Sequence, residues 1–337
     1  MSDSNGYKVM IGGQEISPDA TSAKGVVCDL HIDMMSMAEV TLSETAKPLF
    51  SNFKLAQEVE VKMGGSDDAV FKGVVTEIRM SLTKGDTSMR IIAMDPLVKL
   101  YASRESKAYE KMSDSDIVKS VISAAGATAS ADATTGKSDY VIQRNESNLT
   151  FAKRLAARNN FHLRANGKGE VEFKKAQFAG TPVDVPFEGV ISLEYRMSTI
   201  DVPPSVKLVG WDPVDKKKVE ANADSGKVDT IGGGKNVVSD TAQLLWKNPS
   251  HVSDVQVSAQ GSADAMASSD LNRAARNFLR GVVRVSGNAT LVPGKLLKIS
   301  GNEAGFNPTG YIIGARHIID GSVYTSEIHF ISNTYPE

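Results

Sequence analysis

The chain has 337 residues, of which 41% are hydrophobic and 23% charged, and 38 Lys and Arg against 40 Asp and Glu leave a formal net charge of -2. This length suggests two or three domains, and the near balance of charge argues against general attraction to nucleic acid or an anionic membrane. The single cysteine, Cys28, can form neither an internal disulfide nor a multi-cysteine metal site. No segment approaches the roughly 20 apolar residues that span a bilayer. The N-terminus has no secretory signal pattern, so we expect synthesis and assembly in the cytoplasm.

Residues 1–101 have the alternating pattern of β-strands. Apolar and polar residues alternate over residues 26–33, 37–42, 58–63, 71–80 and 89–94, with turn residues between several of these segments. Several such segments without a helical period predict a small antiparallel β-barrel or sandwich. Cys28 lies inside the first alternation, so we expect a small buried hydrophobic side chain there.

The pattern changes in residues 102–176, which we expect to form a small α/β insert. A capping box at Ser113 begins a helical period that ends at Gly126, and Ser147 can cap a second helix. The small, polar residues 127–139 predict a loop. Asn166 and Gly167 between two alternating segments predict a β-hairpin.

Strand patterning returns in residues 177–337, for which we expect a second β-barrel. A glycine-rich polar stretch over residues 221–236 predicts a flexible loop. Residues 262–280 have a helical period, with Gly281 as the expected stop. Strands resume at Leu291 and continue to Ile331.

The first and last strand regions share a spacing of key residues. Counted from one glycine in each region, an arginine follows at the sixth position and an isoleucine at the eighteenth. The matched residues are Gly73 with Gly310, Arg79 with Arg316, Ile91 with Ile328, and, upstream, Val61 with Leu297. This echo predicts two copies of one barrel flanking the insert, although two hairpins of similar length can also look alike by chance. A trimer of such chains presents six equivalent positions.

Several segments in a fixed order resemble one known family. They are Phe71–Ile78, Ile91–Leu100, the helix start at Ser115, Glu146–Leu155, Val209–Pro213, and Leu291–Gly294 with Phe306, Gly310 and Tyr311. In this order and spacing they resemble the phage late-control-gene-D family of tail hub proteins, and they are similar to the N-terminal hub part of VgrG spike proteins of type VI secretion. The resemblance covers residues 55–330.

The resemblance implies two tube-like β-barrels flanking a small α/β domain, in a homotrimer with pseudo-six-fold symmetry. Such a protein is a structural baseplate hub of a contractile phage tail or phage-like injection particle. It joins the hexameric ring of the inner tube protein to a trimeric spike, among other baseplate components. In VgrG-like proteins a needle follows the matching region, and this chain stops at Glu337, so a separate spike protein is expected. No cofactor, nucleic-acid specificity or membrane insertion is expected.

The sequence contains no motif that predicts catalysis, and we expect a protein that is not an enzyme. Gly232–Lys235 lacks the first glycine and the Ser or Thr of a phosphate loop. The five histidines have no helical metal-binding spacing, although His317 and His329 could face each other across a hairpin. The candidate positions are instead for assembly or structure: Gly73, Asp95, Pro96, Trp211, Asp212, Pro213, Pro293, Gly294, Phe306, Gly310 and Tyr311.

Three alternatives remain open at this stage. Trp211 suits either a subunit contact or a domain core. The protein could bind or process the cell wall, which an assay on peptidoglycan would test. It could also load effectors, with residues 127–139 or 221–236 contacting cargo, and deletion of either loop would test that role.

Overall fold

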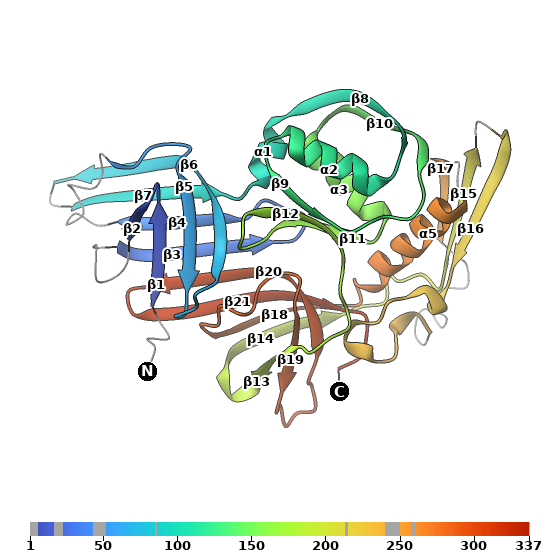
Figure 1. Ribbon diagram of the computed structural model, residues 1–337. Helices are drawn as coiled ribbons and strands as arrows, with labels where there is room; N and C mark the ends of the chain where they lie inside the picture. Colours follow the sequence, from blue (N-terminus) through green and yellow to red (C-terminus); the bar gives the residue numbers. More distant parts are fainter. Residues whose placement is uncertain are drawn as a thin grey trace.

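The computed structural model describes residues 6–16, 23–42, 52–84, 86–212, 215–239, 250–257 and 260–336. In this part of the chain a 13-stranded sheet combines strands from the N-terminal and C-terminal parts of the chain. Three smaller sheets lie beside it (Figure 1). The fold is mainly β with an α/β insert, as the sequence predicts.

The first half of the large sheet is formed by the strands before residue 95. They are β1 (Tyr7–Ile11), β2 (Gln14–Ile16), β3 (Ala23–His31), β4 (Met37–Leu42), β5 (Glu58–Met63), β6 (Ala69–Thr83) and β7 (Asp86–Met94). Every second side chain of β4 and β5 is buried, because one face of each strand is turned to the core. Cys28 is completely buried in that core, as predicted.

The insert has a hydrophobic core of its own and lies above the sheet in Figure 1. Its elements are α1 (Leu97–Ala102), β8 (Arg104–Met112), α2 (Asp114–Ala124), β9 (Thr128–Ala131), β10 (Ser138–Ser147), α3 (Asn148–Arg158), β11 (Phe161–Ala165) and β12 (Glu170–Lys175). The side chains of Ser113 and Ser147 accept hydrogen bonds from the amides of Asp116 and Thr150, so both predicted caps are confirmed.

One prediction for this region needs correction, and one helix was not predicted. The predicted loop over residues 127–139 contains β9, which pairs in parallel with β12. The sequence of β9 is small and polar, and its strand form depends on that distant partner. The short helix α1 was not predicted, and its Leu97 and Leu100 are buried in the core of the insert.

The second half of the large sheet contains its remaining strands. They are β13 (Val183–Pro186), β14 (Val190–Met197), β18 (Leu279–Ser286), β19 (Leu296–Ser300), β20 (Thr309–Asp320) and β21 (Val323–Ser332), with the 3-10 turn η2 (Phe187–Gly189) between the first two. A separate group of elements lies between β14 and β18 in the chain: β15 (Val206–Asp212), β16 (Lys217–Ala223), the 3-10 turns η3 (Ser225–Lys227) and η4 (Ile231–Gly233), β17 (Ser250–Gln256) and α5 (Gln260–Ala275).

The structure corrects one helix boundary and one loop prediction here. The predicted helix over 262–280 ends at Ala275, and Gly281 lies inside β18, where a Cβ atom would come within 2.3 Å of the Phe330 ring. The stretch 221–236 is not simply a flexible loop. Ile231 is completely buried, and its amide donates to Asn333 Oδ1 over 2.9 Å.

The two halves have the same strand order, β3-β4-β7-β6-β5 in the first and β14-β18-β21-β20-β19 in the second. Both also have β-bulges at equivalent places. One bulge follows Val75 in β6 and Ile312 in β20, and another follows Ala23 in β3 and Val190 in β14. Bulges at matching positions are specific features of a ladder, so the two halves repeat one strand arrangement, as the predicted duplication requires.

The ladders also fix which residues are equivalent. Gly73 and Gly310 lie opposite Val59 and Leu297, respectively. Leu297 therefore corresponds to Val59, and the match with Val61 that the sequence suggested is wrong by two residues.

The halves are joined by a ladder between β20 and β3, which runs from Gly314 opposite His31 to Asp320 opposite Gly25. Figure 1 shows the resulting order from β6 and β7 at the top, through β4 and β3, to β20, β21, β18 and β14 below. The turns of the β6–β7 and β20–β21 hairpins lie at the left end of this sheet. The insert and the α5 group lie at the right end.

Candidate functional site

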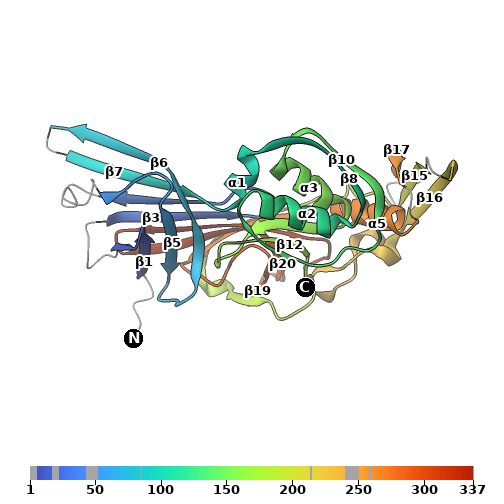
Figure 2. The ribbon, with the colours of Figure 1, turned by 45° about the horizontal axis from the view of Figure 1, so that its top comes forward.

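The large sheet has an open edge along the outer part of β6. As far as Val74 this strand pairs with β5, whereas from Glu77 to Leu82 it pairs with β7 alone among the described residues. Leu82 is 70% exposed and Met80 50%. Figure 2 shows this hairpin projecting beyond the rest of the sheet. An open edge presents unpaired backbone groups and readily accepts another strand.

A second open edge belongs to β14. Within the described part of the chain it pairs with β18 alone. Leu193, Tyr195 and Met197 alternate along it and share one face. Tyr195 is 46% exposed and Met197 43%, and the Tyr195 ring stacks on Phe306 with the centroids 3.6 Å apart. Each half of the molecule therefore has one edge with exposed apolar side chains.

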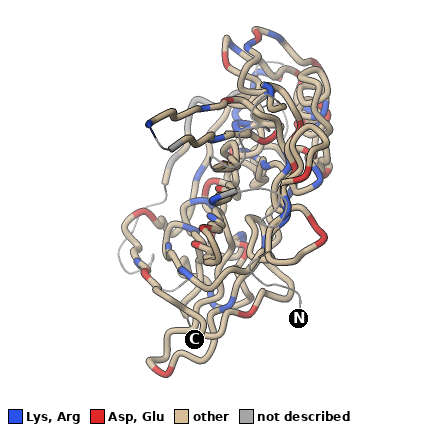
Figure 3. The backbone as a smooth tube through the Cα atoms, turned by 90° about the vertical axis from the view of Figure 1, so that its left-hand side faces the viewer, with Lys and Arg blue, Asp and Glu red and all other residues tan. Residues whose placement is uncertain are grey.

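The opposite faces of these two edges are charged. β6 has Glu77 and Arg79, which are joined by a hydrogen bond of 2.5 Å from Arg79 Nε to Glu77 Oε1, and β14 has Glu194 and Arg196. Both signs are also interspersed along the rest of the described chain (Figure 3). A mixture of this kind allows complementary pairing between strands without a field of one sign.

The structure places two of the three candidate glycines, Gly73 and Gly310, inside ladders. A Cβ atom at Gly73 would lie 2.2 Å from the Met94 carbonyl oxygen, and one at Gly310 would lie 2.3 Å from Phe330 Cδ2. Glycine allows this close approach of strand to neighbour. Both positions thus have a structural explanation inside the single chain.

Asp95 is buried at the end of β7, and Pro96 is the N-cap of α1. The Asp95 carboxylate accepts hydrogen bonds from the amides of Ser36, at 2.7 Å, and Leu97, at 2.9 Å. Burial raises the pKa of Asp95 to about 6, against the lowering effect of those amides. The residue thus connects the β3–β4 turn to the start of the insert.

The Trp211 side chain is 52% exposed on β15, which excludes the core position and leaves the subunit contact as a prediction. Asp212 is buried and accepts a hydrogen bond from the amide of Asp215. Pro213 lies outside the described residues.

Two of the remaining candidates, Pro293 and Tyr311, bond to the insert, and Gly294 bonds within the second half. Arg164 of β11 donates a hydrogen bond to the Pro293 carbonyl, and the Gly294 amide, at a φ of 89°, donates to Ile312. The Tyr311 hydroxyl is 2.9 Å from His162 Nδ1. Burial lowers the pKa of His162 to about 4, so the ring is neutral at pH 7.

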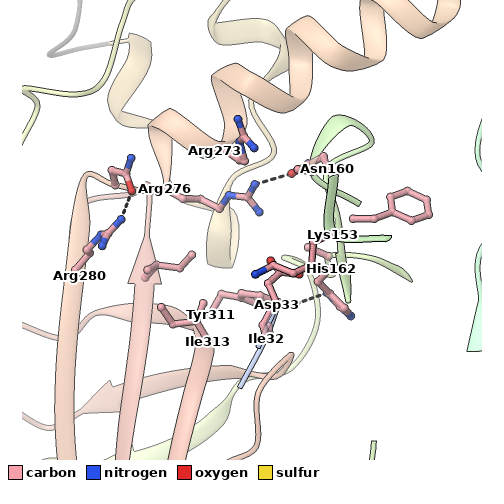
Figure 4. A pocket seen from close by; sticks show the side chains of 15 residues that line it. Ile32, Asp33, Lys153, Asn160, His162, Arg273, Arg276, Arg280, Tyr311 and Ile313 are labelled. Carbon is pink, nitrogen blue, oxygen red and sulfur yellow. Dashed lines mark hydrogen bonds between the residues drawn. The ribbon is translucent and has the colours of Figure 1, made fainter. Parts of the chain in front are cut away.

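A cavity of about 520 Å³ lies at this junction, between α3, β11, α5 and β20 (Figure 4). Four cationic side chains and one carboxyl group line it: Lys153, Arg273, Arg276, Arg280 and Asp33. Asp33 accepts from the Leu163 amide over 2.9 Å, and burial raises its pKa. Arg276 donates to Asn160 over 2.7 Å. These groups bond across the junction, so the arrangement positions the insert against the rest of the molecule.

A metal site, the suggested pair of His317 and His329, and a membrane-spanning helix find no support among the described residues. No group of three or more His, Cys, Asp or Glu in that part of the chain is placed to hold a metal ion. Across the β20–β21 hairpin, His317 lies opposite Ser326 and not opposite His329, so the suggested histidine pair is wrong. None of the helices that the structure describes is long and apolar enough to cross a membrane.

Sequence reasoning missed the two open edges. Their signal is present, because Ile78, Met80 and Leu82 alternate in β6 as Leu193, Tyr195 and Met197 do in β14. An alternating strand predicts one buried face. It does not reveal whether the covering partner belongs to the same chain.

Solved structures with this fold include phage tail proteins and a secretion component. The tail protein from Neisseria meningitidis MC58 has a TM-score of 0.74 at 12% identity and covers 97% of this chain and 96% of its own. The 43 kDa tail protein of prophage MuSo2 from Shewanella oneidensis has a TM-score of 0.71 at 13% identity, with coverage of 98% and 99%. The E. coli c3393 protein, a component of the type VI secretion system, has a TM-score of 0.65 at 14% identity, with coverage of 98% and 78%.

These likenesses establish the fold, which is that of phage tail proteins and of a type VI secretion component. The family model of the Alg8 N-terminal domain matches residues 2–321, and the chain belongs to that family. None of the curated proteins compared with the chain matches it.

Proposed function

We propose that this protein is a structural hub of a contractile phage tail or phage-like injection particle, of the late-control-gene-D and VgrG type. It is assembled in the cytoplasm as a homotrimer with pseudo-six-fold symmetry. The trimer joins the hexameric ring of the inner tube protein to a separate trimeric spike and contacts other baseplate components. The proposal includes no catalytic step and no cofactor.

The observation that carries the proposal is the duplicated strand order with one open edge in each half. Three chains with two equivalent halves each provide six similar units in a ring. Pairing the open edge of one chain with that of the next covers the exposed backbone groups of both strands. Symmetry mismatch between a six-fold and a three-fold partner is then absorbed within each chain.

The two ends of the large sheet differ, and this difference supports an orientation of the hub between tube and spike. The turns of the β6–β7 and β20–β21 hairpins, which are equivalent, lie at one end. The insert, which occurs once per chain, and the α5 group lie at the other. In a trimer the first end repeats six times and the second three times. We therefore place the tube at the hairpin end and the spike at the end with the insert.

A pair of leucine variants tests the trimer. Leu82→Lys changes an exposed leucine on the open edge of β6, whereas Leu55→Lys changes a leucine of similar exposure, 62%, outside any strand. Burying a leucine contributes about 1.5–3 kcal/mol, and the ring contains three such contacts. We expect native mass spectrometry to give three times 36.0 kDa for the wild type and for Leu55→Lys. Leu82→Lys should remain a folded monomer.

A wild-type chain that stays monomeric at every soluble concentration, or two variants that assemble alike, would contradict the proposed trimer. Circular dichroism of both variants excludes unfolding as the cause of a loss of assembly.

A further inference from the structure

We infer that β6 of one chain pairs antiparallel with β14 of a second copy, in the register that β20 and β3 use inside one chain. This inference rests on the proposed trimer and deepens it. It specifies which strands meet and which residues lie opposite each other.

The equivalence of the strands follows from the ladders alone. β6 and β20 are aligned by Gly73 with Gly310 and by the bulge that follows two residues later. β3 and β14 are aligned by the bulge at their starts, which places Val26 with Leu193. Within the chain β20 continues past β19 to pair with β3. By equivalence β6 continues past β5, where its edge is open, to pair with a β14.

The register is transferred residue by residue. On the core face of the in-chain ladder, Ala315 lies opposite Leu30, His317 opposite Cys28, and Ile319 opposite Val26. The equivalent pairs between two copies are Ile78 with Met197, Met80 with Tyr195, and Leu82 with Leu193.

The chemistry of these pairs provides a check, because it was not used to derive them. The six in-chain residues are all buried. All six of their counterparts are apolar, and four of them are 43–70% exposed in the single chain. A shift by one residue would instead place the charged face of one strand against the apolar face of the other. The transferred register is thus the one that buries apolar side chains on both strands.

The charged face is compatible with the same register. Arg79 lies directly opposite Arg196, and each has an acidic residue on its diagonal, Glu194 for Arg79 and Glu77 for Arg196. Diagonal neighbours in an antiparallel ladder are close enough for long side chains to interact. Two diagonal ion pairs therefore flank the contact between the two arginines.

Engineered disulfides test the register. We compare Met80→Cys with Tyr195→Cys, which lie opposite each other, and Met80→Cys with Leu193→Cys, which are shifted by two residues on the same face. Direct neighbours have Cβ atoms about 5 Å apart and diagonal ones about 7–8 Å, and a disulfide requires about 4 Å. Cys28 is completely buried and stays unchanged. The variant with Met80→Cys alone is the control.

We expect the opposite pair to cross-link on the order of tenfold more than the shifted pair under mild oxidation. Each chain carries both cysteines, so a closed ring gives linked dimers and trimers and nothing larger, whereas the control gives at most dimers. A native trimer that links better through the shifted pair, or through neither, overturns the register and leaves the proposed function standing. A chain that remains monomeric overturns the proposed function as well.

Discussion

Replacement of Asp95 by asparagine should change how stability depends on pH. The carboxyl group is buried and bonded to two amides. Burial disfavours the charged form and raises its pKa to about 6 from an ordinary value of 3.8. The folded protein therefore holds a proton that the unfolded chain has already released between about pH 4 and pH 6. The free energy of unfolding that Asp95 contributes consequently falls as pH rises through this window and is constant above it.

The magnitude follows from the pKa difference. At about 1.4 kcal/mol for each pH unit, a rise from 3.8 to about 6 corresponds to about 3 kcal/mol. Asp95→Asn removes the titration. It also lowers stability by an amount that does not depend on pH, because Ser36 and Leu97 donate to two different carboxylate oxygens and asparagine has only one side-chain oxygen. The stability of the wild type minus that of Asp95→Asn should thus fall by about 2.4 kcal/mol between pH 4 and pH 7, which is most of the full difference.

Urea denaturation followed by circular dichroism at several pH values measures this difference. Most other titrating groups are shared by the two proteins and cancel. A difference that stays flat, or that grows with pH, would refute the reasoning. It would mean that the amides of Ser36 and Leu97 stabilise the carboxylate more than burial destabilises it.

Three further substitutions test the contacts inside the chain. Gly73→Ala should cost on the order of 1–3 kcal/mol and more than Gly310→Ala, because the new Cβ would meet the Met94 backbone oxygen in the first case and an aromatic ring, which can turn, in the second. Urea denaturation compares them, and equal costs would contradict this explanation. Tyr311→Phe should cost about 1–3 kcal/mol, because His162 Nδ1 loses its buried hydroxyl partner. An unchanged denaturation midpoint would count against that bond.

Local signals allowed much of the fold to be predicted. Ser113 and Ser147 each cap a helix through a bond to an amide three residues away, so a short stretch of sequence is sufficient. The repeated spacing from Gly73 and Gly310 reflects a tight approach at equivalent points of two ladders. Such requirements act directly on residue type.

The failures occurred where the decisive partner is distant in sequence. Thr128–Ala131 forms β9 because β12 pairs with it, although its own residues favour a loop. Residues after Ala275 keep a helical period, yet β18 begins at Leu279, where it pairs with β21. Propensity is a weak guide when a ladder is available. The open edges are the extreme case, since the partner that we propose for them lies on another chain.

The β20–β3 ladder within the chain and the proposed β6–β14 ladder between chains differ in the size and polarity of equivalent residues. Within the chain His317 lies opposite Cys28, and His317 Nδ1 is 2.9 Å from Ser326 Oγ. At the proposed contact between chains the counterparts are the larger apolar residues Met80 and Tyr195. Association of separate chains must offset roughly 4–15 kcal/mol of lost translational and rotational freedom, a cost that a joint within one chain does not have. Greater apolar area at the intermolecular joint is the expected response, because hydrophobic stabilisation scales with the area removed from water.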